Sequence, residues 1–495
     1  MKYRKIKVAE LNNIDVYGKR FNGYDLAAYI NKNTDDIDVV QLVNHKFSSQ
    51  PFVKKIFKPI FEPYDYIIAN HERDILKIKN QLSITEEALI TNKHYKNADI
   101  LHFHMYHNMN LPIAFLERIS PSKQIVIDIH DTYWLSDSKI PVLDAFAFMK
   151  DNLISATKQR KNVLNSIDAT FVVHSPYILE LFKKSSVTKN LTKNVKMINF
   201  GIDTNLFKPM NNQDIRKKLH IPQGNIVLFC RAQKEFKGID YIEKALSSIK
   251  SDRKITIITT NEKNLLKSLH NTHQIIDMGM VSDDKKMVEL YNACDIFLAP
   301  STEESFGFMA VEAMSCEKPV IVFNGTALPH TTNAPKIGIS VNRNATSLQK
   351  AIEQLIANDK ERIKRGKAGR VYVCKNYSLD AYYTNYVNLF RKLYRKNRTP
   401  HTKTKTPKTK VHHDFLEPIN QFIFDKKTPQ PPVINNIDYS DPSIQKYIQS
   451  FNHQIFIKIK KLKKKATPLT LIKRLIPSKI KRYIKSKLRS NYETK

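Results

Sequence analysis

Short runs of apolar residues alternate with amphipathic stretches over about the first 375 residues of the chain. Many of the runs are continuous and β-branched, which is typical of strands covered on both faces. Stretches with the helical period, such as Ile239–Lys250 and Lys285–Cys294, lie between them. We expect strands at Lys5–Leu11, Val39–Leu42, Ile100–His104, Ile125–Ile129, Ala169–Val173, Val195–Asn199, Ile226–Cys230, Ile255–Thr259, Ile275–Met278, Ile296–Ala299 and Val320–Val322. This α/β alternation predicts doubly wound parallel sheets.

Two such sheets fit the length of 495 residues better than one. We place their junction near residues 190–208, which predicts one Rossmann-like domain at 1–194 and a second at 195–378. A helix at 379–395 is expected to cross back to the first domain.

The composition changes after residue 396. Residues 396–453 contain the basic stretch TPHTKTKTPKTKVHH and the Pro-rich stretch TPQPPVINN, so we interpret them as a linker that is partly disordered. Residues 454–495 form a basic tail, within which an apolar stripe with the helical period extends over Leu469–Arg489. Pro477 is expected to divide this stretch into two short helices.

The excess of basic residues predicts an anionic partner. The chain carries 81 Lys and Arg against 47 Asp and Glu, a formal net charge of +34, which favours an anionic partner. Fifteen Lys and Arg and one acidic residue lie in 454–495. A basic amphipathic tail is typical of in-plane association with an anionic membrane surface. A helix that docks on the enzyme body and a nucleic-acid contact are the alternatives, and the tail has few aromatic residues for the latter.

The four cysteines, Cys230, Cys294, Cys316 and Cys374, form no CxxC pair, so we expect small buried thiols in place of a zinc site or a disulfide framework. The N-terminal residues show no apolar core of a secretory signal, and no run of about 18 apolar residues predicts a membrane span. These features predict a cytoplasmic protein.

The stretch DIFLAPSTEESFGFMAVEAMSCEKPVIVF, Asp295–Phe323, carries the most specific signal for chemistry. Its pattern predicts a strand, a loop, a helix and a second strand. The loop would follow the carboxyl end of a parallel strand, where open α/β sheets bind ligands. Gly307 lets the backbone approach a ligand, and the amides of Phe306, Gly307 and Phe308 at the helix N-terminus could bind a phosphate.

Two carboxylates, Glu304 and Glu312, are eight residues apart in this stretch and could accept hydrogen bonds from sugar hydroxyls. The pair within PSTEESFGFMAVEAM resembles the E-x7-E signature of the glycosyltransferase family 4 enzymes. INFGIDTNLFKP, CRAQKEFKGIDYIEKAL, GMVSDDKKMVELYNACDIFLAPS and KQIVIDIHDTYW resemble other segments of that family, in the same order. The likeness covers about residues 1–395 and is sharpest over 195–325.

The resemblance implies a GT-B fold, in which two Rossmann-like domains flank a cleft, and a retaining transfer from a nucleotide-sugar donor. It implies that Glu304 binds the transferred sugar and Glu312 the ribose. Arg231 and Lys237 would hold the diphosphate, with Gly238 in the same loop. Cations there would stabilise the charge that grows on the leaving group. Neither a metal nor another cofactor is expected.

Departures from the family pattern are few. Cys230 stands where the family usually has glycine before the arginine, and Lys237 is the sixth residue after Arg231, where the family usually has its lysine at the fifth. Glu317 stands where a glycine normally ends the helix, at a cost of about 1 kcal/mol if it adopts the left-handed conformation. The usual glycine pair before Pro-Glu is replaced by the stretch from Gly325 to His330.

Residues of the first domain give less specific signals. His130 ends an apolar strand, and the resemblance implies a residue of the cleft that touches the donor sugar or phosphate. Gly23 could lie near the donor phosphate or simply begin the first helix. His102, His104 and His107 are spaced as metal ligands can be, but without a nearby carboxylate cluster we expect a strand end that lines the cleft.

We therefore expect Glu304, Lys237 and His130 to serve catalysis in a metal-independent hexosyltransferase-type enzyme. It would move a sugar from a nucleotide diphosphate to a glycan or lipid-linked glycan in cell-surface polysaccharide biosynthesis. We expect the protein to lie on the cytoplasmic face of the membrane. Two alternatives remain. One is a non-catalytic GT-B-like partner that binds sugar nucleotides, and the other is a basic nucleic-acid-binding protein.

Overall fold

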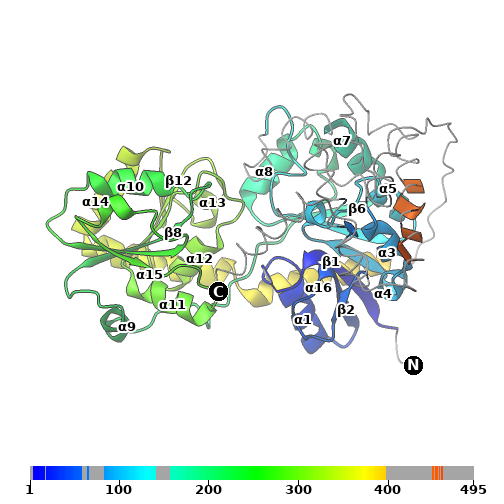
Figure 1. The fold of residues 1–495 in the computed structure, drawn as a ribbon, viewed down its shortest axis with the longest axis horizontal. Helices are drawn as coiled ribbons and strands as arrows, with labels where there is room; N and C mark the ends of the chain where they lie inside the picture. The colour runs from blue at the N-terminus through cyan, green and yellow to red at the C-terminus, as the bar shows by residue number, and fades with distance from the viewer. Residues whose placement is uncertain are drawn as a thin grey trace, which may run out of the picture. The chain divides into compact units, whose positions relative to one another are not determined.

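The computed structural model describes residues 4–16, 18–57, 64–65, 68, 83–140, 157–396, 449–450, 452–454, 456–457 and 459–460. Its backbone contacts divide the chain into two compact units (Figure 1). Of the described residues, the first unit comprises those up to residue 127, 157–169 and those from 392 on, and the second comprises 128–140 and 170–391.

The N-terminal sheet is parallel and has seven strands in the order β3-β2-β1-β4-β5-β6-β7. The strands are β1 (Ile6–Ile14), β2 (Ile37–His45), β3 (Val53–Lys55), β4 (Ile100–Phe103), β5 (Gln124–Ile129), β6 (Ala169–Val173) and β7 (Val195–Met197). The helices along this part of the chain are α1 (Tyr24–Asn33), α3 (Thr85–Thr91), α4 (Lys93–Asn97), η3 (Tyr106–Asn108), α5 (Phe115–Ile119), α7 (Thr157–Ser166), α8 (Pro176–Lys184) and η5 (Lys189–Leu191).

The second unit contains a complete six-stranded parallel sheet in the order β10-β9-β8-β11-β12-β13. Its strands are β8 (Ile226–Ala232), β9 (Ile255–Asn261), β10 (Gln274–Asp277), β11 (Ile296–Ala299), β12 (Val320–Phe323) and β13 (Ile339–Val341). The helices along this part of the chain are α9 (Gln213–Lys218), α10 (Ile239–Ser247), η6 (Lys267–Leu269), α11 (Asp284–Ala293), α12 (Phe308–Ser315), α13 (Leu328–Thr331), α14 (Ala345–Ala357), α15 (Asp359–Asn376) and α16 (Leu379–Lys396).

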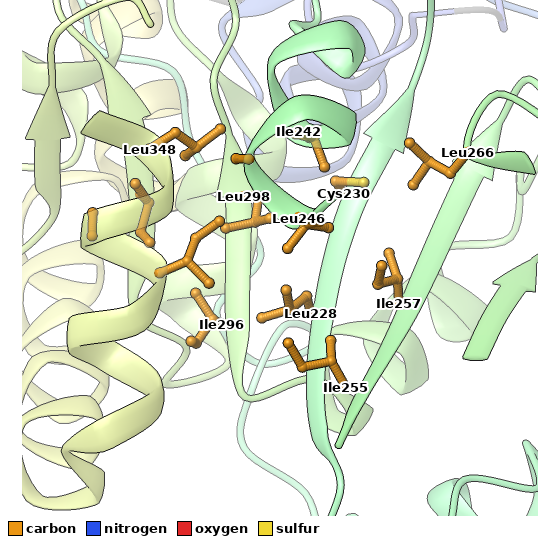
Figure 2. Close-up of a cluster of buried hydrophobic side chains, with 14 of the residues drawn as sticks. Leu228, Cys230, Ile242, Leu246, Ile255, Ile257, Leu266, Ile296, Leu298 and Leu348 are labelled. Atoms are coloured by element: carbon orange, nitrogen blue, oxygen red, sulfur yellow. The ribbon is translucent and has the colours of Figure 1, made fainter. Parts of the chain in front are cut away.

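The core of the second unit follows the two-residue period of its strands. Leu228 and Cys230 on β8 share one face with their register partners on β11, Ile296 and Leu298. Figure 2 shows these side chains between the sheet and Leu348 of α14, and α10 covers the same face. The strands are apolar on both faces because the opposite face is covered too: the ring of Phe229 packs against that of Tyr291 on α11.

All eleven predicted strands are present, and the two parallel sheets confirm the doubly wound fold. Only β3 and β13 were missed among the strands described. Each has three residues and lies at a sheet edge, so neither has the continuous apolar run on which the prediction depended. The N-terminal sheet extends to β7, beyond the predicted domain boundary at residue 194.

Residues 449–460 return to the first unit after the predicted linker, and they are helical wherever they are described. Oδ1 of Asn452 accepts a hydrogen bond of 2.9 Å from the Ser83 amide, and Nδ1 of His453 lies 2.9 Å from Oε2 of Glu87. Phe456 and Ile459 are buried. Helical structure thus begins inside the stretch 396–453 that was predicted to be a linker.

The predicted helices around Leu469–Arg489 lie outside the described residues. The predicted helix at 379–395 is present as α16, and its crossing to the first domain stays a prediction. Within the described ranges, no helix combines the length and the apolar character needed to cross a bilayer.

Candidate active site

The second sheet brings two loops together at its centre. β8 and β11 are neighbours, and the strand order runs outward from them in opposite directions. The chain therefore leaves the two strands toward opposite sides of the sheet, and the loops that follow them open a crevice at the carboxyl edge, where α/β proteins bind ligands. The loop after β8 contains Lys237 and Gly238, and the loop after β11 contains Glu304 and Gly307.

Lys237 and Glu304 meet across this crevice. The Nζ atom of Lys237 lies 2.6 Å from Oε2 of Glu304, although 67 residues separate them in the sequence. Both side chains are about four-fifths buried, with 17% and 20% of their surfaces exposed. A cation that can bind a phosphate oxygen and a carboxylate that can bind a hydroxyl thus lie side by side.

Backbone contacts fix the first loop against the second. The Thr302 amide donates a hydrogen bond of 2.9 Å to the Phe236 carbonyl. Phe236 and Gly238 have positive φ angles of 33° and 72°. A Cβ atom on Gly238 would collide with the carbonyl oxygen of Pro300, so glycine is required both by the backbone conformation and by the close approach of the second loop.

Two helices begin at this edge of the sheet. Gly238 is the N-cap of α10, and Gly307, with a φ of 91°, is the N-cap of α12. The unpaired amides and the dipole at a helix N-terminus favour an anion. The sequence predicted this arrangement for Gly307 and its neighbours, and the helical period of Ile239–Lys250 predicted the helix that begins after Gly238.

A pocket lies between the two loops. Its lining includes five of the predicted donor-site residues, namely Arg231, Lys237, Glu304, Gly307 and Phe308. Its volume is about 150 Å³. Small-molecule sites usually enclose about 300–1,000 Å³, so this pocket fits part of a nucleotide-sugar and not the whole molecule.

Arg231 lies in this pocket despite the altered spacing to Lys237. It is the penultimate residue of β8, and its Nη2 atom donates a bond of 3.3 Å to Oδ1 of Asn261. The residue before it, Cys230, points into the core beside Leu228, where burial raises the pKa of its thiol to about 12. The cysteine thus replaces the usual glycine without reaching the pocket.

Glu312 lies behind this pocket and does not line it. The Tyr291 hydroxyl donates a bond of 2.7 Å to Oε2 of Glu312, and both residues are buried. Phe306 is also buried, within an aromatic cluster, with ring centroids 5.2 Å from Phe200 and 5.4 Å from Tyr377. The ribose role of Glu312 and the phosphate role of the Phe306 amide stay predictions.

The structure adds residues that the sequence did not single out. Ser301, Met309 and Leu328 also line the pocket, and Tyr291 orients Glu312. Ser301 belongs to the Pro-Ser pair of the recognised motif, which could have identified it. Leu328 could not have been found, because it approaches Gly307 only through the folding of the next loop.

His130 is in the second unit, at the end of β5, where it stacks on two rings. Its centroid is 4.9 Å from that of His174 and 5.6 Å from that of Phe200, and its Nε2 atom lies 3.7 Å from Oδ2 of Asp128. Gly23 is in the first unit and begins α1 as its N-cap, with a φ of 85°. The proposed contacts of His130 and Gly23 with a donor stay predictions.

Two other expectations have clear outcomes. Glu317 ends α12 with a φ of 59°, as its position in place of glycine predicted. Cys230, Cys294 and Cys316 are buried, and burial raises the pKa of each thiol to about 12, whereas Cys374 is exposed on α15. The expectation of buried thiols is therefore right for three of the four.

Residues 211–372 match the family model described as "Glycosyl transferases group 1". A curated relative, the D-inositol 3-phosphate glycosyltransferase of Corynebacterium aurimucosum, is 25% identical over an alignment of 276 residues, and the match covers 48% of this chain and 66% of the relative. The match to the enzyme of the same name from Corynebacterium glutamicum covers 46% of that protein at 26% identity. The chain thus spans less than two thirds of the length of these curated relatives.

Solved structures extend the likeness in fold to most of the chain. Sucrose-phosphate synthase of Thermosynechococcus elongatus aligns with a TM-score of 0.62 at 18% identity, over 79% of this chain and all of that one. HepE of Anabaena, solved with UDP and glucose, aligns with a TM-score of 0.58 at 15% identity, over 78% of this chain and all of that one. The fold is the GT-B fold, and the resemblance to glycosyltransferases is confirmed. The assignment of this chain to glycosyltransferase family 4 stays a prediction.

Proposed function

We propose that this chain, whose residues 211–372 match the group 1 glycosyl transferases, moves a sugar from a nucleotide diphosphate to an acceptor with retention of configuration. The observation that supports this best is the pairing of Lys237 with Glu304 between two helix N-termini at the centre of the second sheet. That arrangement supplies donors for a diphosphate beside an acceptor for sugar hydroxyls.

In the proposed reaction, Lys237 and Arg231 bind the diphosphate and stabilise the charge that develops on it as the glycosidic bond breaks. Glu304 accepts hydrogen bonds from the transferred sugar, whose anomeric carbon becomes oxocarbenium-like. The acceptor hydroxyl attacks from the face that the leaving group vacates, and a phosphate oxygen takes its proton. The cationic side chains and the helix N-termini take the part that a metal plays elsewhere, so the proposed transfer needs none.

The acceptor and the location are further parts of the proposal. The basic tail supports a glycan or lipid-linked glycan acceptor at the inner face of the membrane, because thirteen Lys and Arg against one acidic residue follow residue 460. The helical residues 449–460 would hold this segment on the first unit. A role in cell-surface polysaccharide biosynthesis is the corresponding proposal.

A mass-spectrometric screen of nucleotide-sugar hydrolysis tests the proposal. The full-length protein is incubated with a panel of UDP-, GDP- and dTDP-sugars without added Mg²⁺ or Mn²⁺. The expected result is release of the nucleoside diphosphate from one class of donor. Donor binding with no turnover, on addition of glycan and lipid-linked acceptors as well, would contradict the transferase and favour a non-catalytic partner.

A further inference from the structure

A second group of buried polar side chains lies at the carboxyl end of the N-terminal sheet, where β1 and β4 are neighbours. Glu10 on β1 is the register partner of His102 on β4, so both side chains lie on one face of the sheet. His104 follows two residues later and shares that face. All three are fully or almost fully buried in the first unit, with exposures of 0–1%.

The three side chains converge on a single atom. Oε2 of Glu10 lies 2.7 Å from Nδ1 of His102 and 2.6 Å from Nε2 of His104. The centroids of the two imidazole rings are 4.2 Å apart. One carboxylate oxygen of Glu10, one ring nitrogen of His102 and one ring nitrogen of His104 all lie within 4.8 Å of one another.

Gly23 covers this cluster. A Cβ atom at Gly23 would lie 2.5 Å from Nε2 of His104 and 3.0 Å from Oε2 of Glu10, so the loop before α1 passes directly over the converging atoms. Gly23 is also the N-cap of α1. This close approach, together with its positive φ, accounts for the glycine without reference to a sugar donor.

We propose that Glu10, His102 and His104 bind one divalent first-row metal ion, and that the ion is Zn²⁺. Two imidazole nitrogens and a carboxylate oxygen are a common zinc ligand set. Zn–N and Zn–O bonds are about 2.0–2.2 Å long, so each nitrogen would have to move about 0.7 Å away from the Glu10 oxygen for the atoms to surround an ion tetrahedrally. The dication also compensates the charge of a fully buried carboxylate, which is costly to bury alone.

The ion would join the middle of β1 to the end of β4 beneath the loop that leads to Gly23. It would act on the stability of the first unit, which contains all three ligands. The sequence does not predict a metal here, because no carboxylate cluster lies near the histidines along the chain. The fold supplies Glu10, which precedes His102 by 92 positions. His107, the third histidine of that motif, lies on η3 outside the group.

The test uses tag-free, full-length protein purified without chelators. We expect elemental analysis to find about one zinc per folded chain. Titration of metal-depleted protein with Co²⁺ should give the visible absorption bands of a cobalt ion bound to nitrogen and oxygen ligands. Glu10→Gln and His104→Gln should each weaken Zn²⁺ binding at least about 100-fold. His107→Gln, which replaces another buried histidine, should bind as the wild type does.

Two results would overturn the proposal. One is a folded wild-type protein that contains no zinc and takes up neither Zn²⁺ nor Co²⁺, because hydrogen bonds alone would then hold the cluster. The other is unchanged zinc affinity in Glu10→Gln and His104→Gln, which would place the ion elsewhere. The wild-type measurement decides the first point even if a variant fails to fold.

Discussion

Nζ of Lys237 lies 2.6 Å from Oε2 of Glu304, across the crevice between the loops that follow β8 and β11. The two opposite charges compensate each other in this contact. In the proposed function a donor separates them, because its phosphate takes the ammonium group and its sugar hydroxyls take the carboxylate. The pair is thus a closed form of the same contacts that would bind the donor.

Substitution Glu304→Gln tests this assignment. It keeps the shape of the side chain and removes the charge, so we expect sugar transfer to fall about 10²–10³-fold. The free energy of unfolding should fall by about 1–3 kcal/mol, because the substitution leaves the largely buried Lys237 ammonium without its counter-charge. Turnover of a donor identified in the nucleotide-sugar screen is the measurement. Glu303→Gln in the same loop is the control, and equal activity of the two variants would rule out the role of Glu304.

Gly238 and Gly224 form a matched pair that separates backbone strain from collision. Both have positive φ angles, 72° and 86°, but a Cβ atom at Gly238 would strike the Pro300 carbonyl, whereas nothing lies within 4 Å of one at Gly224. Gly224→Ala should cost only the left-handed strain, about 1–2 kcal/mol. Gly238→Ala should cost more and abolish donor binding, as measured by urea unfolding and calorimetry. Equal losses of stability would contradict the interlocked loops.

Tyr291 is predicted to position Glu312. Tyr291→Phe removes the hydroxyl that donates to Oε2 of Glu312 in a buried site, so the free energy of unfolding should fall by about 1–3 kcal/mol. If Glu312 holds the ribose, the Kd for the donor should also rise about tenfold, a loss of about 1.4 kcal/mol of binding. Tyr241→Phe, where the ring packs on Phe323, is the control. An unchanged donor Kd would separate Glu312 from the ribose.

Much of the second unit follows directly from the sequence. Its central strands are continuous apolar runs, and the loop with Glu304 and the glycine at 307 is a local pattern that needs no tertiary information. The meeting of Glu304 with Lys237 depends instead on which strands are neighbours. The family resemblance supplied that knowledge, and periodicity alone could not.

Other features depend on the packing of side chains from distant segments. Burial against Tyr291 keeps Glu312 out of the pocket lining, although its spacing from Glu304 matches the family signature. The helical residues 449–460 could not be recognised as a docked segment, because Asn452 finds its partner Ser83 only in the folded unit. Phe456 and Ile459 are two apolar residues in a stretch rich in lysine, so the sequence alone does not indicate that they are buried.

The basic segment after residue 460 is predicted to bind anionic membranes. A chain that ends at Lys460 keeps the docked helical residues, so it should lose binding to phosphatidylserine vesicles while its melting temperature and donor hydrolysis stay unchanged. A chain that ends at Lys396 should also melt at a lower temperature. It lacks Phe456 and Ile459, and burial of each such side chain contributes about 1.5–3 kcal/mol. Undiminished vesicle binding by the Lys460-terminated chain would contradict the membrane proposal.

Asp65 should make the stability of the first unit depend on pH. Burial raises the pKa of its carboxyl group to about 7, although Asn110 and Thr85 each donate it a hydrogen bond of 2.9 Å. In the unfolded chain the pKa is near 3.9, about three units lower. Between these values the folded state holds a proton that the unfolded state has lost. Stability therefore falls as the pH rises from about 4 to about 7, by as much as about 4 kcal/mol, and then levels off.

Substitution Asp65→Asn should remove this dependence, because an amide oxygen can accept both hydrogen bonds and carries no charge at any pH. The variant and the wild type should melt at similar temperatures near pH 4, and the variant should become progressively more stable by comparison up to about pH 7 to 8. Asp38→Asn, at an exposed position on β2, is the control. A difference between Asp65→Asn and wild type that does not grow with pH would show that Asp65 is already ionised in the folded protein, with its two hydrogen bonds compensating for burial.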